Sequence, residues 1–186
     1  MKRLFVAFNI NPDPDFLSAF CRLRHALSHE KINWVEEKNI HITLKFLGET
    51  EERLIPDISQ VLKNLTKATS SFTFRLAGLG VFGSSYNPRV IWTGIEPYDE
   101  LATLMKRASL DFESLGFQTG RQNQVPHLTL GRIKYLQDKV FFQKILDKMK
   151  GISSHPVSVK HLILYESILR PKGPDYYSIE TFLLKK

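Results

Sequence analysis

Two short segments of the chain are near copies of each other, and they constrain its fold more than any other feature. The first reads His-Ile-Thr-Leu from His41, and the second reads His-Leu-Thr-Leu from His127. Polar and apolar residues alternate in both segments, which is the pattern of a strand with one buried face. In each strand the histidine and the threonine therefore share a face. An amphipathic surface strand would explain one copy, but it explains two copies poorly.

The rest of the hydrophobic pattern predicts the element order β-α-β-α-β-β-α-β-α-β-β. Strands are expected at residues 3–8, 39–47, 72–82, 89–95, 127–133, 157–165 and 176–184, and helices at 15–30, after 50, at 98–115 and at 139–150. Thr50 is expected to cap the second helix, and Gly116 to end the third.

This order predicts an α/β (α+β) fold in which helices flank mixed or antiparallel sheets. A strand, a helix and a motif strand recur in both halves of the chain. We therefore expect one bilobed domain with pseudo-twofold symmetry over residues 1–186.

Composition limits the class of protein. Hydrophobic residues make up 42% of the chain and charged residues 24%, as in folded globular proteins. No apolar run approaches the roughly 18 residues that a membrane span needs, so no membrane association is expected. The basic N-terminus has too short an apolar run for a signal peptide, and Cys21 is the single cysteine. Both features favour a cytoplasmic location.

The net charge of +7 is unevenly distributed. Residues 1–120 hold 14 basic and 14 acidic side chains, whereas residues 121–186 hold 12 basic and 5 acidic ones. Such a one-sided field favours an anionic partner, either nucleic acid or a phosphorylated small molecule. A solvated, lysine-rich surface would explain the same charge equally well.

The residue types of the two motifs suit the cleavage of a phosphodiester. Imidazole can donate or accept a proton near neutral pH. Threonine hydroxyls can donate hydrogen bonds to phosphate oxygens. If the two strands lie side by side, His41, Thr43, His127 and Thr129 would enclose a pocket for one phosphate. The expected chemistry needs no metal and no cofactor.

The double motif resembles that of the two-histidine (2H) phosphoesterase superfamily, in particular the RNA 2′,3′-cyclic phosphodiesterases, also called 2′–5′ RNA ligases. The resemblance covers almost the whole chain. It is carried by Arg3–Ala7, Asn39–Glu49, Pro88–Trp92, Pro126–Arg132 and Tyr165–Ser167, with Gly173 and Tyr176. Val125 is a departure, because this group often has an aromatic or basic residue there.

The resemblance implies a bilobed fold in which the motif strands line a central cleft. It also implies hydrolysis of a 2′,3′-cyclic phosphate to a 2′-phosphate, with 2′–5′ joining as a weaker activity. His127 would be the general base and His41 the general acid, although the sequence by itself does not order these roles. Thr43 and Thr129 would hold the phosphate. The expected partner is an RNA or oligonucleotide with a 2′,3′-cyclic phosphate end, bound by a monomer.

Four further residues are candidates for substrate contact. Arg132 is a candidate phosphate ligand, although strict alternation places it on the core face unless the strand ends or bulges there. Lys45 is expected on the same face as His41, where a solvated lysine is an equal alternative. Phe46 and Tyr165 are candidates for base stacking by resemblance, and ordinary packing explains them equally well.

Other patterns are weaker. Gly78–Gly83 matches the glycine spacing of a dinucleotide site, but a strand is expected after it, not a helix. His25 and His29 have the spacing of a zinc pair without a third ligand nearby. Trp92 is expected in the core. Two rival functions stay open: a non-catalytic nucleotide- or RNA-binding module, and a 2H enzyme that acts on a small cyclic nucleotide.

Overall fold

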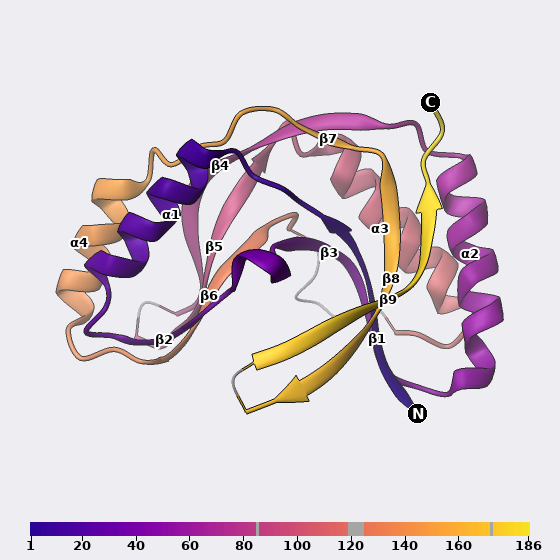
Figure 1. Ribbon diagram of the computed structural model, residues 1–186, viewed down its shortest axis with the longest axis horizontal. Coiled ribbons are helices and arrows are strands. Elements are labelled where there is room, and N and C mark those ends of the chain that lie inside the picture. Colours follow the sequence, from indigo (N-terminus) through magenta and orange to yellow (C-terminus); the bar gives the residue numbers. More distant parts are fainter. Residues whose placement is uncertain (85, 119–124, 172) are drawn as a thin grey trace.

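The computed structural model describes residues 1–84, 86–118, 125–171 and 173–186 (Figure 1). The strands in these residues are β1 (Lys2–Asn9), β2 (Lys31–Trp34), β3 (His41–Thr50), β4 (Phe72–Gly83), β5 (Pro88–Glu96), β6 (Leu128–Tyr135), β7 (Val157–Val159), β8 (His161–Arg170) and β9 (Gly173–Leu183). The helices are α1 (Pro14–Ala26), α2 (Ile55–Lys67), α3 (Asp99–Glu113) and α4 (Lys139–Met149), with short 3₁₀ turns η1 (Glu37–Asn39) and η2 (Glu52–Leu54).

The strands form two antiparallel sheets with matching order. The first sheet runs β3-β1-β8-β9, and the second runs β2-β6-β5-β4-β7. The motif strands β3 and β6 occupy equivalent places beside β1 and β5, and β2 is an addition outside β6. This arrangement confirms the predicted α+β fold, and the matching strand order accounts for its pseudo-twofold character.

Helices cover the two sheets separately. Helices α2 and α3 pack on the first sheet, and α1 and α4 lie with the second (Figure 1). The chain passes repeatedly between the sheets, because α1 and β2 follow β1 but belong to the opposite side. A single cluster of buried hydrophobic side chains spans both sheets. The core thereby fixes the relative position of β3 and β6, which contact one another.

Helix α1 begins one residue earlier and ends sooner than its sequence pattern predicts. Asp13 caps it by accepting the backbone N–H groups of Asp15 and Phe16, each at 3.1 Å. The helix ends at Ala26 instead of Glu30. The Glu30 carboxylate is buried and accepts the backbone N–H of Gln137 at 2.6 Å, so it serves the loop before α4.

The predicted cap at Thr50 is wrong. Thr50 is the last residue of β3 and is buried, and its hydroxyl donates to the carbonyl oxygen of Gly48 at 3.1 Å. Helix α2 begins at Ile55, after η2, with Pro56 in its first turn. A proline is tolerated in that turn because its missing N–H would have no partner there.

Two strand predictions also need correction. The short strand β2 was not predicted, because four residues give too short a pattern. The predicted strand 157–165 is two strands, since β7 pairs with β4 in the second sheet and β8 pairs with β1 in the first. The prediction for Gly116 is confirmed: it has a φ of +86° just after α3.

Candidate active site

Both motif strands shift their register immediately after the motif threonine. In β3, Thr43 pairs with Ala7 of β1 and Lys45 pairs with Val6, which leaves Leu44 as an extra residue. Such a bulge breaks the alternation of side chains between the two faces. Lys45 and Phe46 therefore lie on the opposite faces from those that strict alternation predicts, until a second shift at Leu47.

The second motif strand repeats this irregularity. In β6, Thr129 pairs with Trp92 of β5 and Gly131 pairs with Ile91, so Leu130 is the extra residue. Arg132 then shares the face of Thr129 and is exposed. The bulge that the sequence argument required for Arg132 is therefore present.

The placement predicted for Lys45 is wrong for the same reason. The bulge turns Lys45 away from His41 to the face of Val6, where it is 2% exposed. Its Nζ donates to the carbonyl oxygen of Gln118 at 3.0 Å. Burial lowers the pKa of Lys45, and the charge of Glu113 opposes this shift. Lys45 ties β3 to the chain after α3 and does not line the site.

The two histidines are held by the same kind of bond. Nδ1 of His41 lies 2.6 Å from the carbonyl oxygen of Asn39, and Nδ1 of His127 lies 2.7 Å from that of Val125. A carbonyl oxygen can only accept, so each Nδ1 carries the donated hydrogen. In the neutral ring, Nε2 is then the basic atom of both histidines.

Aromatic rings fix the planes of both imidazoles. The ring centroid of His41 lies 5.2 Å from that of Phe5 and 5.1 Å from that of Tyr176. The ring of His127 lies edge-on to Phe82 at 4.7 Å and to Trp92 at 6.3 Å. The two histidines are thus oriented by rings from different sheets.

The prediction that Trp92 belongs to the core is wrong. Its ring stacks on Phe82 at 5.1 Å and lies beside His127. Gly80 makes this position available, because a Cβ there would come within 2.1 Å of the Trp92 ring. The glycine-rich segment 78–83 therefore accommodates a tryptophan, and it does not bind a dinucleotide through a helix.

The electrostatic surroundings act on both histidines in the same direction. Burial is the largest cause and lowers the pKa of His41 and of His127. The carbonyl acceptors of Asn39 and Val125 oppose this shift. The charge of Arg132 lowers both pKa values further, so its guanidinium acts on both rings. Arg132 has no ion-pair partner among the described residues.

The remaining predicted residues lie around this centre. Thr43 and Thr129 are half-buried on the faces that hold the histidines. Phe46 follows the first bulge at the position that Arg132 has after the second, and it is 49% exposed. Tyr165 stacks on Phe5 at 5.1 Å, and burial raises its pKa.

Sequence reasoning did not select Tyr176 as a site residue. Its ring contacts His41, and burial raises its pKa while the charge of Arg132 opposes the shift. Its pairing with Ser167 in the β8–β9 hairpin brings it to His41, whereas the sequence marked it only as part of the family resemblance. A cavity of about 530 Å³ opens beside these side chains, lined by Asn39, Arg132, Pro174 and Tyr176 among others.

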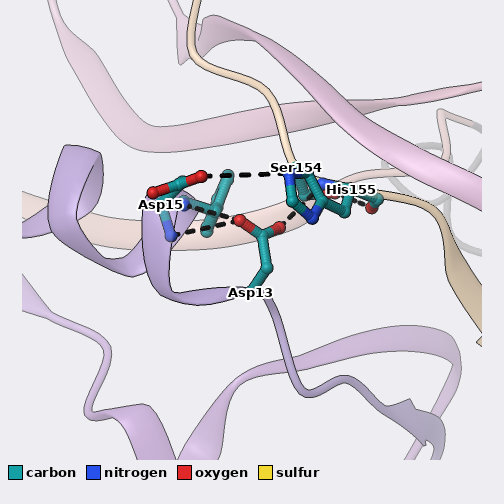
Figure 2. A network of polar contacts seen from close by, with 5 residues as sticks. Asp13, Asp15, Ser154 and His155 are labelled. Carbon is teal, nitrogen blue, oxygen red and sulfur yellow. Dashed lines mark hydrogen bonds and ion pairs between the residues drawn. The ribbon is translucent and has the colours of Figure 1, made fainter.

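One group of three side chains in the described part of the chain has the spacing of a metal site. Ligand atoms of Asp13, Asp15 and His155 lie within 4.8 Å of one another, and neither His25 nor His29 belongs to the group (Figure 2). Both Asp13 oxygens already accept backbone N–H groups, from α1 and from His155 at 2.7 Å. Asp15 and His155 are exposed, and Nε2 of His155 lies 3.8 Å from an Asp15 carboxylate oxygen. This group joins the start of α1 to the chain before β7.

Two antiparallel sheets that each carry a His-x-Thr strand define a two-histidine phosphoesterase. The model of the family described as LigT like Phosphoesterase matches residues 10–92 and 95–176, and each stretch contains one motif. The chain belongs to this family, and it is a phosphodiesterase of the hydrolase class.

Two relatives align with most of this chain. The chain is 36% identical over 143 residues to an RNA 2′,3′-cyclic phosphodiesterase of Thermotoga maritima, over 77% of this chain and 74% of the relative. It is 33% identical over 178 residues to one of Methanocaldococcus jannaschii, over 96% and 98% of the two chains.

Solved structures share the fold. The crystal structure of TT0787 of Thermus thermophilus has a TM-score of 0.76 at 25% identity, over 98% of both chains. That of E. coli LigT complexed with 3′-AMP has a TM-score of 0.75 at 21% identity, over 100% of this chain and 99% of the other.

None of the helices in the described part of the chain has the length and apolar character that crossing a membrane requires.

Proposed function

We propose that this protein is a metal-independent RNA 2′,3′-cyclic phosphodiesterase that uses His41 and His127 as its proton-transfer groups. One observation carries the proposal: both Nδ1 atoms are bound to backbone carbonyls, which leaves Nε2 of each ring as the atom that exchanges a proton. Two such atoms, one from each sheet, match the two proton transfers that phosphodiester hydrolysis needs. The names of the relatives support the same substrate.

In this mechanism His127 is the general base and His41 the general acid. Nε2 of His127 takes a proton from water as the water oxygen attacks the phosphorus. The bond between phosphorus and the 3′ oxygen breaks, and His41 donates a proton to that oxygen. The product keeps the phosphate on the 2′ oxygen.

The phosphate itself would be held by Thr43, Thr129 and Arg132. The threonine hydroxyls and the guanidinium can donate to its non-bridging oxygens. The bound negative charge also favours the protonated form of a neighbouring imidazole. Substrate binding thus raises the pKa of His41 and favours the protonated form that acts as the general acid.

The nucleoside would lie against aromatic side chains. Phe46 is exposed and Tyr165 is half-buried, and Phe5 lies between them with centroid distances of 6.2 and 5.1 Å. Bases at single-stranded RNA ends stack on such surfaces.

We propose that the protein acts as a monomer, because one chain supplies both histidines. We also propose that it works in the cytoplasm and that 2′–5′ joining is the weaker reverse-type activity.

Product analysis tests this function. An oligonucleotide with a 2′,3′-cyclic phosphate end should be converted to a product that carries a 2′-phosphate. A 3′-phosphate product would contradict the assignment of the bond between phosphorus and the 3′ oxygen as the one that breaks. Binding without any turnover would favour the rival nucleotide- or RNA-binding module. A cyclic mononucleotide, measured in parallel, separates an RNA enzyme from one that prefers small cyclic nucleotides.

A further inference from the structure

Asn39 makes hydrogen bonds in two directions, and one of them ends at His41. Its carbonyl oxygen accepts the Nδ1–H of His41 at 2.6 Å. Its side-chain Nδ2 donates to the carbonyl oxygen of Pro174 at 3.0 Å. Pro174 is the second residue of β9, at the tip of the β8–β9 hairpin. One residue therefore links that hairpin to the atom that orients His41.

The backbone around Asn39 is a single 3₁₀ turn, joined to the chain just after β1 through the bond from the N–H of Ile10 to the carbonyl oxygen of Ile40 at 3.4 Å. The N–H of Asn39 donates to Glu36 at 2.8 Å, and the N–H of Ile40 donates to Glu37 at 3.1 Å. The turn also reaches the hairpin through Lys38 and Asp175, whose charged atoms lie 3.6 Å apart. The side chains are 64% and 38% exposed, so this ion pair contributes little. The Asn39 side chain is the stronger tether.

The second motif reaches the same geometry by other means. Nδ1 of His127 donates to the carbonyl oxygen of Val125, and the next residue is Pro126. A proline has no N–H to hold that peptide in place, but its ring fixes φ. Pro126 is also buried. A rigid residue thus supports His127, whereas a side-chain bond to another element supports His41.

We propose that Asn39 is a positioning residue that couples the β8–β9 hairpin to the orientation of His41. By holding η1 against Pro174, it keeps the carbonyl that fixes the His41 ring in place. The cavity lined by Asn39, Arg132, Pro174 and Tyr176 lies at this joint, so a shift of the hairpin alters the cavity and the acceptor of His41 together. The inference rests on the proposed function only in taking His41 as a proton-transfer group.

The test replaces the side chain and observes the histidine directly. In Asn39→Ala, we expect NMR titration of the substrate-free protein to give a lower pKa for His41, because the bond to the carbonyl favours the imidazolium. We expect kcat to fall roughly ten- to a hundredfold, as when an outer partner of an oriented histidine is lost. The fall should be larger in kcat than in KM, because the bond that Asn39 supports ends at His41 and not at a phosphate ligand.

A second variant separates orientation from charge and also serves if Asn39→Ala does not fold. Asn39→Asp keeps the size but cannot donate to Pro174, and its negative charge should raise the pKa of His41. We expect kcat to fall in Asn39→Asp as well, despite the opposite pKa shift. Lys38→Ala is the control, because it removes the other link to the hairpin and should stay near wild type.

The result of the NMR titration does not depend on whether the 2′,3′-cyclic phosphate is the substrate. A folded Asn39→Ala protein with wild-type kcat and an unchanged His41 pKa would overturn the coupling. If the wild type does not hydrolyse the cyclic phosphate, the proposed function fails, and the NMR titration still decides the role of Asn39.

Discussion

His41 and His127 make the same bond, each from Nδ1 to the carbonyl oxygen of the residue two positions earlier, at 2.6 and 2.7 Å. The equivalence extends to their strands, which both bulge after the motif threonine. It breaks beyond the bulge, where the first strand presents Phe46 and the second presents Arg132. The fold thus pairs two similarly held imidazoles with different neighbouring side chains.

The pH dependence of kcat/KM should reflect the lowered pKa values of both histidines. This parameter reports the free protein, and the proposed mechanism needs one imidazole neutral and the other protonated. Because both pKa values lie below the usual value, we expect a bell-shaped profile with its maximum on the acid side of about pH 6.5. NMR titration of the two rings should give pKa values that match the two limbs. A maximum well above pH 6.5 would contradict the account.

Arg132→Ala should change both electrostatics and catalysis. Loss of the guanidinium should raise the pKa of His41 and of His127, because its charge lowers both. We expect kcat/KM to fall about 10²–10³-fold, the usual cost of removing a donor to developing charge. Lys134→Ala removes another exposed cation from β6 and is the control. Unchanged histidine titrations together with unchanged turnover would exclude this role for Arg132.

Asp13→Ala should destabilise the fold, because Asp13 caps α1 and also binds the N–H of His155. Loss of such a cap costs about 1 kcal/mol of unfolding free energy, measured by denaturant titration at neutral pH. Asp13→Asn is the matched variant, since its amide oxygen can still cap the helix, whereas its NH2 group cannot accept the N–H of His155. A loss as large in Asp13→Asn would show that the bond to His155 and the charge matter more than the cap.

The stability given by Asp13 should also depend on pH. Burial raises its pKa, but the N–H groups of His155 and Phe16 outweigh this effect, and the net pKa is lowered. A carboxylate whose pKa is lowered by folding stabilises the fold at any pH above its pKa in the unfolded chain, which is about 3.9. That contribution is lost as the pH falls through the lower, folded value. The difference in stability between wild type and Asp13→Asn should therefore shrink in acid.

Activity should survive chelation. The proposed site supplies its acid, its base and its phosphate donors from side chains, so treatment with EDTA should leave turnover of a 2′,3′-cyclic phosphate unchanged. Loss of activity in EDTA that is restored by Zn²⁺ or Mg²⁺ would contradict the mechanism. The group of Asp13, Asp15 and His155 would then need to be tested as a metal site.

The element order was sufficient to predict the fold class, and the paired motifs with their flanking segments led to the family by resemblance, because all of these are local features of the sequence. The bulges at Leu44 and Leu130 were not predictable in this way, since a bulge depends on the partner strand. Strict alternation therefore placed Lys45 on the wrong face. It allowed Arg132 a role in the site only on the condition that the strand ends or bulges there.

Residues that reach the site through tertiary pairing were the hardest to predict. Tyr176 meets His41 only because β9 folds back on β8, and Trp92 meets His127 because Gly80 leaves room for its ring. Thr50 is of a residue type that often caps helices, but in this fold it is the last residue of β3. In each case contacts with distant segments override the local preference.

Turnover by the single histidine variants tests the central claim most directly. His41→Ala and His127→Ala should each lower kcat for a 2′,3′-cyclic-phosphate oligonucleotide by roughly 10²–10⁴-fold, the usual contribution of general acid–base catalysis. Each should also flatten one limb of the pH profile, and the double variant should be little worse than the poorer single one. His25→Ala and His29→Ala serve as controls and should be near normal. If either motif variant is folded by circular dichroism and keeps wild-type turnover, the assignment of the two histidines is wrong.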